Sequence, residues 1–198
     1  MPSARIPSSP PPPPPPPRAS GVSAWIERFA PLVAAGATVL DLACGQGRHA
    51  RFFAGKGHPV VAVDRDESAL AALSGHARIE VRKLDLEAGH WPFGGERFGA
   101  IVVTNYLHRP LLPLLLLALA GDGALLYETF ARGNEAFGRP ANPDFLLQRD
   151  ELWRMAERRL TVVACEQGVV AAPHPGAVLQ RMAAVGPDRP WPPALPVA

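Results

Sequence analysis

The sequence predicts an α/β fold in which a doubly wound sheet of seven strands is mostly parallel and ends in an antiparallel hairpin strand. Three observations predict it. Residues 38–64 read as a short apolar strand, a turn with two glycines, a helical segment and a second apolar strand. Apolar runs then alternate with helical patterns as far as residue 158, which is typical of parallel sheets covered by helices. The last two apolar runs flank Pro173-His174-Pro175-Gly176, which predicts a β-hairpin.

Length and composition indicate one globular domain between two proline-rich tails. The chain has 198 residues, 47% of them hydrophobic and 19% charged, so it can bury a sizeable core. We place this domain at residues 21–186 and expect the tails, 1–20 and 187–198, to be disordered. The eight consecutive prolines at 10–17 are incompatible with the apolar segment of a signal peptide.

Charge, cysteine content and hydropathy narrow the functional classes. The formal net charge is +2 and there is no run of Lys or Arg, so nothing favours nucleic acid as a partner, although such a charge is compatible with it. The two cysteines give neither a disulfide framework nor a metal-binding spacing, and we expect no metal. The apolar stretch 111–120 is shorter than the ~20 residues that span a bilayer. We therefore expect a soluble, cytoplasmic protein without a membrane partner; its oligomeric state is left open.

The elements follow from periodicity and from capping residues. The expected helices are 23–35, 48–55, 66–73, 111–120 and 150–158, and the expected strands are 38–42, 59–63, 79–84, 98–104, 124–130, 160–170 and 177–185. Pro31 should kink the first helix. Asp66 and Asp150 should each cap the helix that follows them. The stretch 111–120 is apolar all round, so this helix should be buried, and Gly121-Asp122-Gly123 should end it.

The turn after the first strand has the features of a nucleotide-binding site. Gly45 and Gly47 let the backbone turn tightly and approach a ligand, and the helix that follows offers free N–H groups. Asp64, after the second strand, can accept hydrogen bonds from both hydroxyls of a ribose. The run 45–50 also fits the G-x-G-x-x-A pattern of dinucleotide-binding proteins. However, Asp41 at the tip of the first strand would repel a pyrophosphate, and it suits a cationic group instead.

Polar side chains follow the fourth and fifth strands, at the edge where ligands bind in doubly wound sheets. His108 is a candidate general base because its unperturbed pKa lies near neutrality, and Tyr106 is the second catalytic candidate. The polar loop 131–144 is long for a connection, and such loops are often functional. Each of these residues has the alternative interpretation of a turn or loop residue held by local backbone. The candidates for substrate contact are Arg109, Glu128, Arg132, Asn134 and Arg139.

Four strings resemble small class I S-adenosylmethionine-dependent methyltransferases, in particular the bacterial branch grouped with tellurite-resistance methyltransferases. They are VLDLACGQGRHARFF, VVAVDRD, TNYLHRPLLP and YETFARGNEAFGRPANPDFLL. The resemblance extends over about residues 22–185, with Ala43 standing where the family has its first glycine. It implies a Rossmann-like sheet whose seventh strand inserts between the fifth and sixth, S-adenosylmethionine as cofactor, and no metal.

The resemblance also implies roles for single residues. Asp41, Gly45 and Gly47 would surround the methionine part of the cofactor. Asp64 would bind the ribose, and Asp85 with Leu86 would bind the adenine. The expected cofactor-binding residues are Asp41, Ala43, Cys44, Gly45, Gly47, Asp64, Arg65, Asp85, Leu86 and Asn105.

The favoured function is methyl transfer to a small-molecule acceptor. An RNA or protein methyltransferase with the same fold is one alternative, and a non-catalytic S-adenosylmethionine-binding module is another. An NAD-dependent oxidoreductase fits the glycine turn but neither Asp41 nor the terminal hairpin, and 198 residues leave no room for a second nucleotide-binding half. The sequence names neither the acceptor nor the methylated atom, and it does not say whether a general base is needed.

Overall fold

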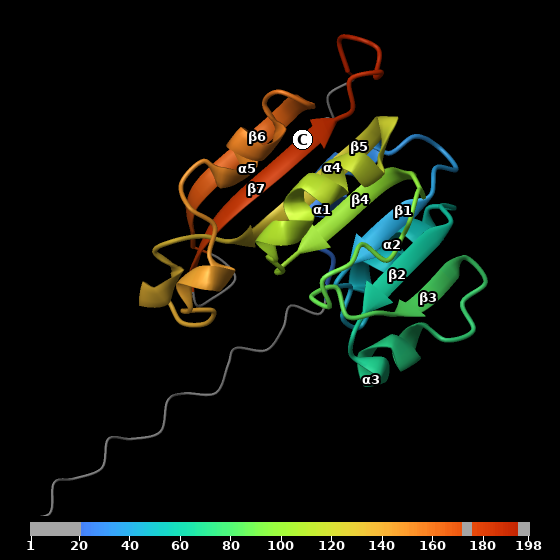
Figure 1. The fold of residues 1–198 in the computed structure, drawn as a ribbon, viewed down its shortest axis with the longest axis horizontal. Coiled ribbons are helices and arrows are strands. Elements are labelled where there is room, and N and C mark those ends of the chain that lie inside the picture. Colours follow the sequence, from blue (N-terminus) through green and yellow to red (C-terminus); the bar gives the residue numbers. More distant parts are fainter. Residues whose placement is uncertain (1–20, 172–175, 194–198) are drawn as a thin grey trace, which may run out of the picture.

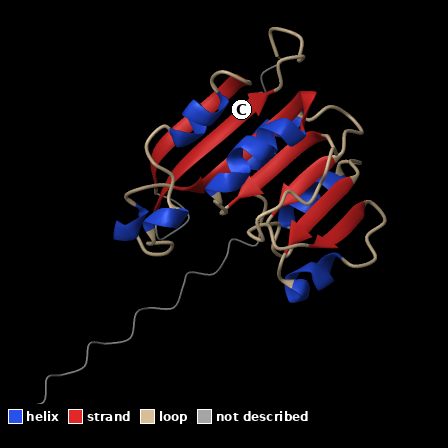
Figure 2. Ribbon diagram, viewed as in Figure 1, coloured by secondary structure: helices blue, strands red, loops and turns tan. Residues whose placement is uncertain are grey.

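The computed structural model describes residues 21–171 and 176–193, where a sheet of seven strands lies between helices (Figures 1 and 2). The helices are α1 (Ala24–Phe29), α2 (Arg48–Gly55), α3 (Glu67–Leu70), α4 (Leu112–Ala118) and α5 (Glu151–Ala156). The strands are β1 (Val39–Leu42), β2 (Val60–Asp64), β3 (Ile79–Lys83), β4 (Phe98–Thr104), β5 (Leu119–Phe130), β6 (Thr161–Val170) and β7 (Ala177–Val185). Residues 1–20, 172–175 and 194–198 lie outside the described residues, and with them most of the expected hairpin turn and the first tail.

The strand order is β3-β2-β1-β4-β5-β7-β6, which confirms the predicted fold. The first five strands pair in parallel, and β7 runs antiparallel between β5 and β6. The arrowheads of β1, β2 and β4 therefore point to the same edge of the sheet (Figure 1). The order reverses between β1 and β4, and at such a point the connections diverge and leave a crevice for a ligand.

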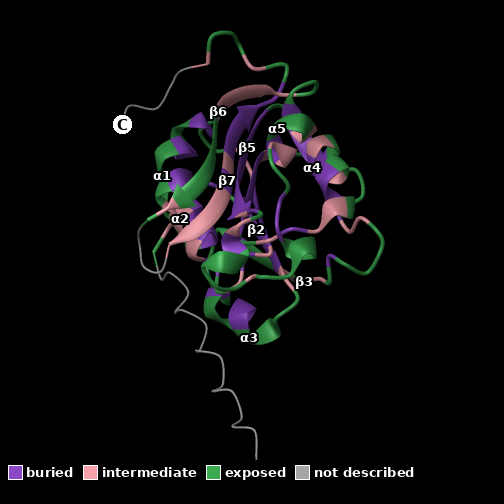
Figure 3. Cartoon of the chain, turned by 90° about the vertical axis from the view of Figure 1, so that its left-hand side faces the viewer, coloured by how far each residue is buried: buried purple, intermediate pink, exposed green. Residues whose placement is uncertain are grey.

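Helices cover both faces of the sheet, α1 and α2 on one side and α4 and α5 on the other (Figure 3). Alternation along β1 decides which side chain joins which layer. Leu40 and Leu42 belong to the core beneath α4, whereas Val39 belongs to the core beneath α1 and α2. Asp41 lies on the same face as Val39, so a carboxylate is buried under the beginning of α2. Residues 21–171 and 176–193 contain no helix with the length and hydropathy of a membrane span.

Two predicted caps had different outcomes. Asp66 caps α3 as predicted, because its Oδ1 accepts hydrogen bonds from the N–H groups of Ser68 and Ala69. The predicted cap at Asp150 is wrong. Its backbone is left-handed (φ +58°) and its side chain makes no capping bond to α5, because the carboxylate accepts from the side-chain amide of Gln167 on β6. The expected break at Pro31 is confirmed, since a 3-10 turn (Ala30–Leu32) replaces the α-helix there.

The prediction that Gly121-Asp122-Gly123 would end the fourth helix is wrong. The helix ends at Ala118, and these residues already belong to β5. The chain after β7 recruits them: the N–H of Gly186 donates to Gly123 O and the N–H of Asp188 to Gly121 O, each at 2.8 Å. A Cβ on Gly186 would overlap Gly121 O, so only glycine allows this approach. The chain after β7 therefore contacts the rest of the domain as far as Asp188 and Arg189.

The fourth helix is also less buried than its composition suggests. Leu112 and Leu115 are buried, but Leu117 is 55% exposed. An all-apolar helix lying on one face of a sheet still turns one side to the outside, because only a single layer covers that face.

Candidate active site

The glycine turn joins β1 to α2 with three left-handed residues. The φ angles are +54° at Ala43, +53° at Gly45 and +72° at Gly47. The N–H of Gly47 closes the turn by donating to Cys44 O at 2.9 Å. A Cβ at Gly47 would overlap the buried side chain of Leu73, so this position requires glycine for both backbone and space. Ala43 adopts a left-handed conformation that costs alanine free energy and that glycine adopts without strain. This explains why the family has a glycine at this position.

Asp64 holds the turn from the end of β2. Its Oδ2 accepts from the N–H of Gly45 at 2.7 Å and its Oδ1 from the N–H of Asp66 at 2.9 Å. The side chain is half-buried, and a carboxylate has about four acceptor sites, so capacity for a diol is left at the edge of the sheet.

Asp41 is buried, with 1% of its surface exposed. Its Oδ2 accepts from the N–H of Ala50 in the first turn of α2 at 2.8 Å, whereas Oδ1 has no hydrogen-bond partner among the described residues. Burial raises the pKa of the Asp41 carboxyl to about 7, against the opposing effects of the Ala50 N–H and of the positive charge on Arg48. A cation near Oδ1 would compensate this buried acceptor. Cys44 is a small buried residue beside it, and burial raises the pKa of its thiol, which keeps it protonated.

The expected adenine-side residues lie after β3. Asp85 is exposed and its Oδ1 accepts from the N–H of Glu87 at 2.9 Å, while Leu86 is buried. Tyr106 reaches towards this turn from the end of β4: burial, followed by the carboxylates of Glu87 and Asp85, raises the pKa of its phenol. The hydroxyl oxygen of Tyr106 is buried, and a hydrogen-bond interaction with the side chain of Glu87 adds to this rise in pKa. Arg65 is exposed and lies close enough to oppose this rise in pKa.

The turn after β4 begins with a left-handed residue, Asn105 (φ +55°). Its N–H donates to Glu128 O at 2.9 Å, and its side chain is exposed at the edge. His108 is half-buried three residues later. Both catalytic candidates, His108 and Tyr106, thus lie in the segment between β4 and α4, and Tyr106 packs against the core beneath α4.

Arg109 is held in a clamp. Its guanidinium donates to both carboxylate oxygens of Glu151, at 2.8 and 3.1 Å, and to the carbonyls of Asp144 and Leu146, at 2.9 and 2.8 Å. Glu151 also accepts from the N–H of Gln148 at 2.7 Å. The arginine therefore ties the turn after β4 to the end of the long loop, and its donors are used within the protein.

Glu128 is buried within the sheet. Its Oε1 accepts from Ser23 Oγ at 2.9 Å, and its Oε2 lies 2.7 Å from Arg181 Nε. Register places Thr104, Glu128, Arg181 and Glu166 opposite one another on β4, β5, β7 and β6, so a polar row crosses four strands. Glu128 thus anchors the beginning of α1 to the sheet rather than standing free in a groove.

His49 is the site residue that the sequence prediction missed. Its Nε2 accepts from the N–H of Ser23 at 3.2 Å, which assigns the proton to Nδ1, 3.3 Å from Thr104 Oγ1. Burial, aided by Arg48, lowers its pKa to about 3, so the ring is neutral. The sequence does contain a signal for the burial of His49, because it lies four residues before Phe53 and so on the same, buried stripe of α2.

The loop after β5 contains the remaining predicted residues. Asn134 is buried and internal: its Nδ2 donates to Pro140 O at 2.9 Å and its Oδ1 accepts from the N–H of Val178 at 3.1 Å. Arg132 and Arg139 are exposed. Of the predicted substrate residues, the structure therefore leaves these two arginines accessible and uses Arg109, Glu128 and Asn134 to hold the surroundings.

The geometry corresponds to that of known proteins. Residues 39–118 match the family model described as a methyltransferase domain. TehB from Haemophilus influenzae is similar in structure, with a TM-score of 0.66 and 20% identity over 79% of this chain and 60% of TehB. This chain therefore spans about three fifths of the TehB chain. No curated protein sequence matches the chain significantly.

Other solved structures are matched over nearly their whole length. A TehB-like S-adenosylmethionine-dependent methyltransferase from Corynebacterium glutamicum has a TM-score of 0.58 and 20% identity over 85% of this chain and 91% of that one. An S-adenosylmethionine-dependent methyltransferase from Mesorhizobium loti has a TM-score of 0.63 and 15% identity over 82% and 98%. The chain thus has the class I methyltransferase fold and resembles the TehB branch, as the sequence strings implied. The proteins from Corynebacterium glutamicum and Mesorhizobium loti are both described as S-adenosylmethionine-dependent.

Proposed function

We propose that this protein is an S-adenosylmethionine-dependent methyltransferase that acts on a small-molecule acceptor. The observation that carries the proposal is the pair of carboxylates around the glycine turn, Asp41 buried with an unpartnered oxygen and Asp64 accessible at the edge. A cofactor with a cationic amino-acid end and a ribose diol needs these two acceptors on either side of one turn.

The residues present fit this cofactor. Asp41, Gly45 and Gly47 would hold its methionine part, with Ala43 and Cys44 completing the turn. Asp64 and Arg65 would lie along the ribose. The adenine would rest near Asp85 and Leu86, and Asn105 would lie beside the reacting end. The orphaned Oδ1 of Asp41 supports this arrangement, because a buried acceptor without a partner is costly until a ligand supplies one.

When bound, S-adenosylmethionine supplies a methyl group already activated by a positively charged sulfur. The protein therefore contributes mainly proximity and alignment. The Arg109–Glu151 clamp and the Glu128–Ser23 anchor fix the two segments that flank the reacting edge. We assign them to positioning rather than to direct contact with the acceptor.

His108 is our choice for a general base where the acceptor needs one. Tyr106 suits a different task, because burial and nearby carboxylates raise the pKa of its phenol and keep it protonated. It can donate a hydrogen bond but does not readily remove a proton. A thiolate acceptor would need no base, so replacement of His108 by Asn separates the two cases through the pH profile of turnover.

Calorimetric titration with S-adenosylmethionine, S-adenosylhomocysteine and NAD tests the cofactor assignment. We expect binding of the two sulfur ligands and not of NAD. Asp64→Ala should weaken that binding about tenfold or more, since hydrogen bonds to a charged group contribute about 1.5–3 kcal/mol each. Asp122→Asn, an exposed acid at the opposite edge, is the matched control and should bind as the wild type does. Binding of NAD alone would contradict the proposal.

A further inference from the structure

A groove of about 450 Å³ lies at the carboxyl edge of the sheet, on the β5–β7–β6 side. Its apolar walls include Ala131, Leu147 and Val178, and two arginines line it, Arg132 from the loop after β5 and Arg149 from the segment before α5. The long loop beside it is the gold segment of Figure 1 that follows β5.

Backbone hydrogen bonds hold one wall of the groove together. Ala131, the residue after β5, forms a parallel bridge with Leu147. The N–H of Arg132 donates to Leu147 O at 2.9 Å. On the other side, the N–H of Ala131 donates to Val178 O at 2.9 Å. These bonds continue the sheet past Phe130 and leave recognition to side chains.

The amide side chains of the groove are also in use. Gln180 is 1% exposed, and its Oε1 accepts from the N–H of Leu152 at 3.2 Å. Gln167 donates its amide to Asp150. The two guanidinium groups are therefore the charged groups that the groove offers to a ligand.

The groove is cationic. Its lining contains Arg132 and Arg149 and no acid. Among the described residues, the Arg132 side chain makes no hydrogen bond or ion pair. The side chain of Arg149 is 89% exposed and, within residues 21–171 and 176–193, pairs only with Asp150, its Nε lying 3.4 Å from Oδ2. Two cations beside apolar walls favour an anion with an apolar body.

The volume of the groove limits the size of the ligands that would fill it. Small-molecule sites usually enclose about 300–1,000 Å³, and a single inorganic oxyanion would leave most of this groove empty. Position links the groove to the proposed reaction, because Ala131 comes three residues after Glu128, whose carbonyl accepts from Asn105 at the turn after β4. Three residues of strand span about 10 Å, a distance that an aromatic acid with a further substituent can bridge.

We propose that this groove binds the anionic end of an organic acceptor, such as an aromatic carboxylate, between Arg132 and Arg149. This inference rests on the proposed methyltransferase function and adds the class of acceptor to it. The acceptor's anion lies in the groove, and its apolar body extends along the strand ends towards His108 and Tyr106.

Fluorescence titration with 1-anilinonaphthalene-8-sulfonate, an organic anion with an apolar body, tests the groove directly. We expect Arg132→Gln and Arg149→Gln each to weaken binding of this probe about five- to tenfold, and the double variant to weaken it more. Benzoate should displace the probe at concentrations at which phosphate does not. Equal displacement by phosphate would show an inorganic-anion site and overturn the assignment to an organic anion.

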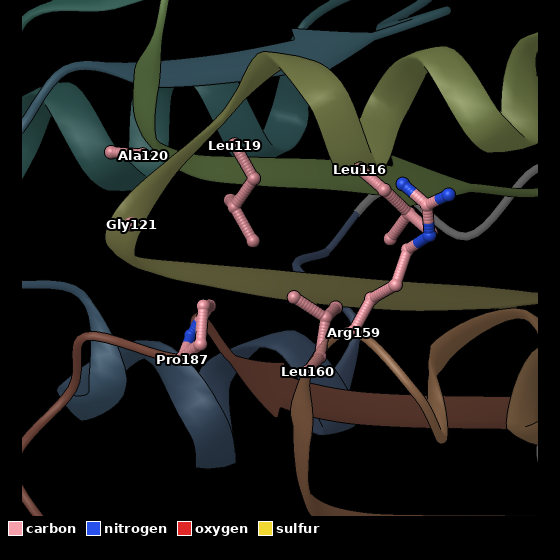
Figure 4. A pocket seen from close by; sticks show the side chains of 7 residues that line it. All are labelled: Leu116, Leu119, Ala120, Gly121, Arg159, Leu160 and Pro187. Atoms are coloured by element: carbon pink, nitrogen blue, oxygen red, sulfur yellow. The ribbon is translucent and has the colours of Figure 1, made fainter.

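A second cavity supplies the control. It measures about 270 Å³ and lies at the opposite edge, among Leu116, Leu119, Leu160 and Pro187, with Arg159 beside it (Figure 4). This cavity is also apolar with one arginine, but it is remote from the glycine turn. Arg159→Gln should leave probe binding unchanged. Loss of binding in Arg159→Gln, with Arg132→Gln and Arg149→Gln unaffected, would overturn the proposal.

Binding of S-adenosylmethionine by the same variants separates this inference from the proposed function. We expect its affinity to be unchanged in Arg132→Gln and Arg149→Gln. In a radiolabelled methyl-transfer screen of aromatic carboxylates, Arg132→Gln should raise the KM of an accepted compound with little change in kcat. If S-adenosylmethionine binds but the arginine variants do not alter probe binding, the groove assignment fails alone. If the probe binds as expected but S-adenosylmethionine does not, the methyltransferase function fails.

Discussion

The two halves of the site are built in different ways. In the half around β1 and β2, the key contacts join residues that are near in sequence: nine residues separate Asp41 from Ala50 and 19 separate Gly45 from Asp64. In the half around β4, β5 and β7, they join distant segments. Ser23 and Glu128 are 105 residues apart, and Trp25 donates its indole N–H to the carbonyl of Met182, 157 residues away.

This difference separates the two functions of the site. The cofactor half is one local unit whose geometry follows from glycines and caps, so it can be shared by proteins with many acceptors. The acceptor half depends on which distant segments meet over the sheet, and a change in those segments alters specificity without disturbing the glycine turn. Variants that damage one half and spare the other test the distinction.

The largest effect is expected in the acceptor half, from Arg181→Met. The change leaves Glu128 buried without its ion-pair partner, which should lower the free energy of unfolding by about 3–5 kcal/mol. Urea unfolding measures the loss. Lys83→Met removes the exposed partner of Glu67 and should change the free energy of unfolding far less, because water screens this exposed pair.

A second variant separates the lost pair from lost packing. Adding Glu128→Gln to Arg181→Met removes the unpaired charge and should recover part of the stability. The folded single variant should still bind S-adenosylmethionine with wild-type affinity. A large loss of that affinity would show that the two halves are coupled, contrary to the comparison.

The next effect belongs to the cofactor half. Gly47→Ala forces alanine into a left-handed backbone and against Leu73, so we expect a loss of about 2–3 kcal/mol in urea unfolding. Gly36→Ala is a close control, because Gly36 has nearly the same φ (+71°) with nothing within 4 Å of an added Cβ. It should cost about 1 kcal/mol. Equal losses in the two variants would show that Leu73 yields and that the position is not sterically closed.

The same contrast explains what the sequence could predict. The bounds of α2, the tight turn at Gly45 and Gly47 and the position of Asp64 at the end of β2 follow from neighbours within about 20 residues, and the structure has them as predicted. His49 was missed because its partners, Ser23 and Thr104, come from other elements 26 and 55 residues away. A buried neutral histidine and an exposed charged one look the same in a sequence.

Asp66 and Asp150 show that contacts with distant segments decide what local sequence leaves open. Both are aspartates placed before a short helix, and local pattern predicts the same cap for each. Asp66 has an extended backbone (φ −85°) and caps, whereas Asp150 is left-handed and bonded to Gln167 on β6. Tertiary contact with a later strand decides between them. For the same reason, local sequence does not reveal that Glu151 occupies Arg109, since the two residues are 42 positions apart.

The pH dependence of stability tests the buried carboxyl group of Asp41 in the cofactor half. Burial raises the pKa of Asp41 to about 7 from 3.8, so the folded protein holds this proton more tightly than the unfolded chain does. Its contribution to stability is therefore lost as pH rises from about 4 to 7. We expect Asp41→Asn to remove a fall of about 2 kcal/mol between pH 5 and 7, measured by urea unfolding at each pH.

The ligand should reverse this preference, since a cation beside Asp41 favours the carboxylate. S-adenosylmethionine affinity should fall as pH drops below 7 in the wild type and stay flat in Asp41→Asn, at a weaker level. Asp122→Asn, with its exposed carboxylate, serves as the control for both slopes. A wild-type affinity that is independent of pH would place the cation elsewhere.

The smallest expected effect is a gain. Ala43 adopts φ +54°, which costs alanine about 1–2 kcal/mol, whereas glycine adopts it freely but loses about 0.5–1 kcal/mol of chain entropy on folding. Ala43→Gly should therefore raise the free energy of unfolding by about 0.5–1 kcal/mol. Ala54→Gly, inside α2, should lower it by about 1 kcal/mol.

Cofactor affinity decides how this gain is interpreted. If Ala43→Gly stabilises the chain and leaves S-adenosylmethionine affinity unchanged, the alanine is a strain that the turn tolerates, and the cofactor half is insensitive to it. If affinity rises as well, the methyl group of Ala43 narrows the space beside Asp41, and part of the cofactor's fit is set at this one position. A loss of stability would mean that the methyl group of Ala43 packs favourably in the turn and that this contribution exceeds the cost of its left-handed backbone.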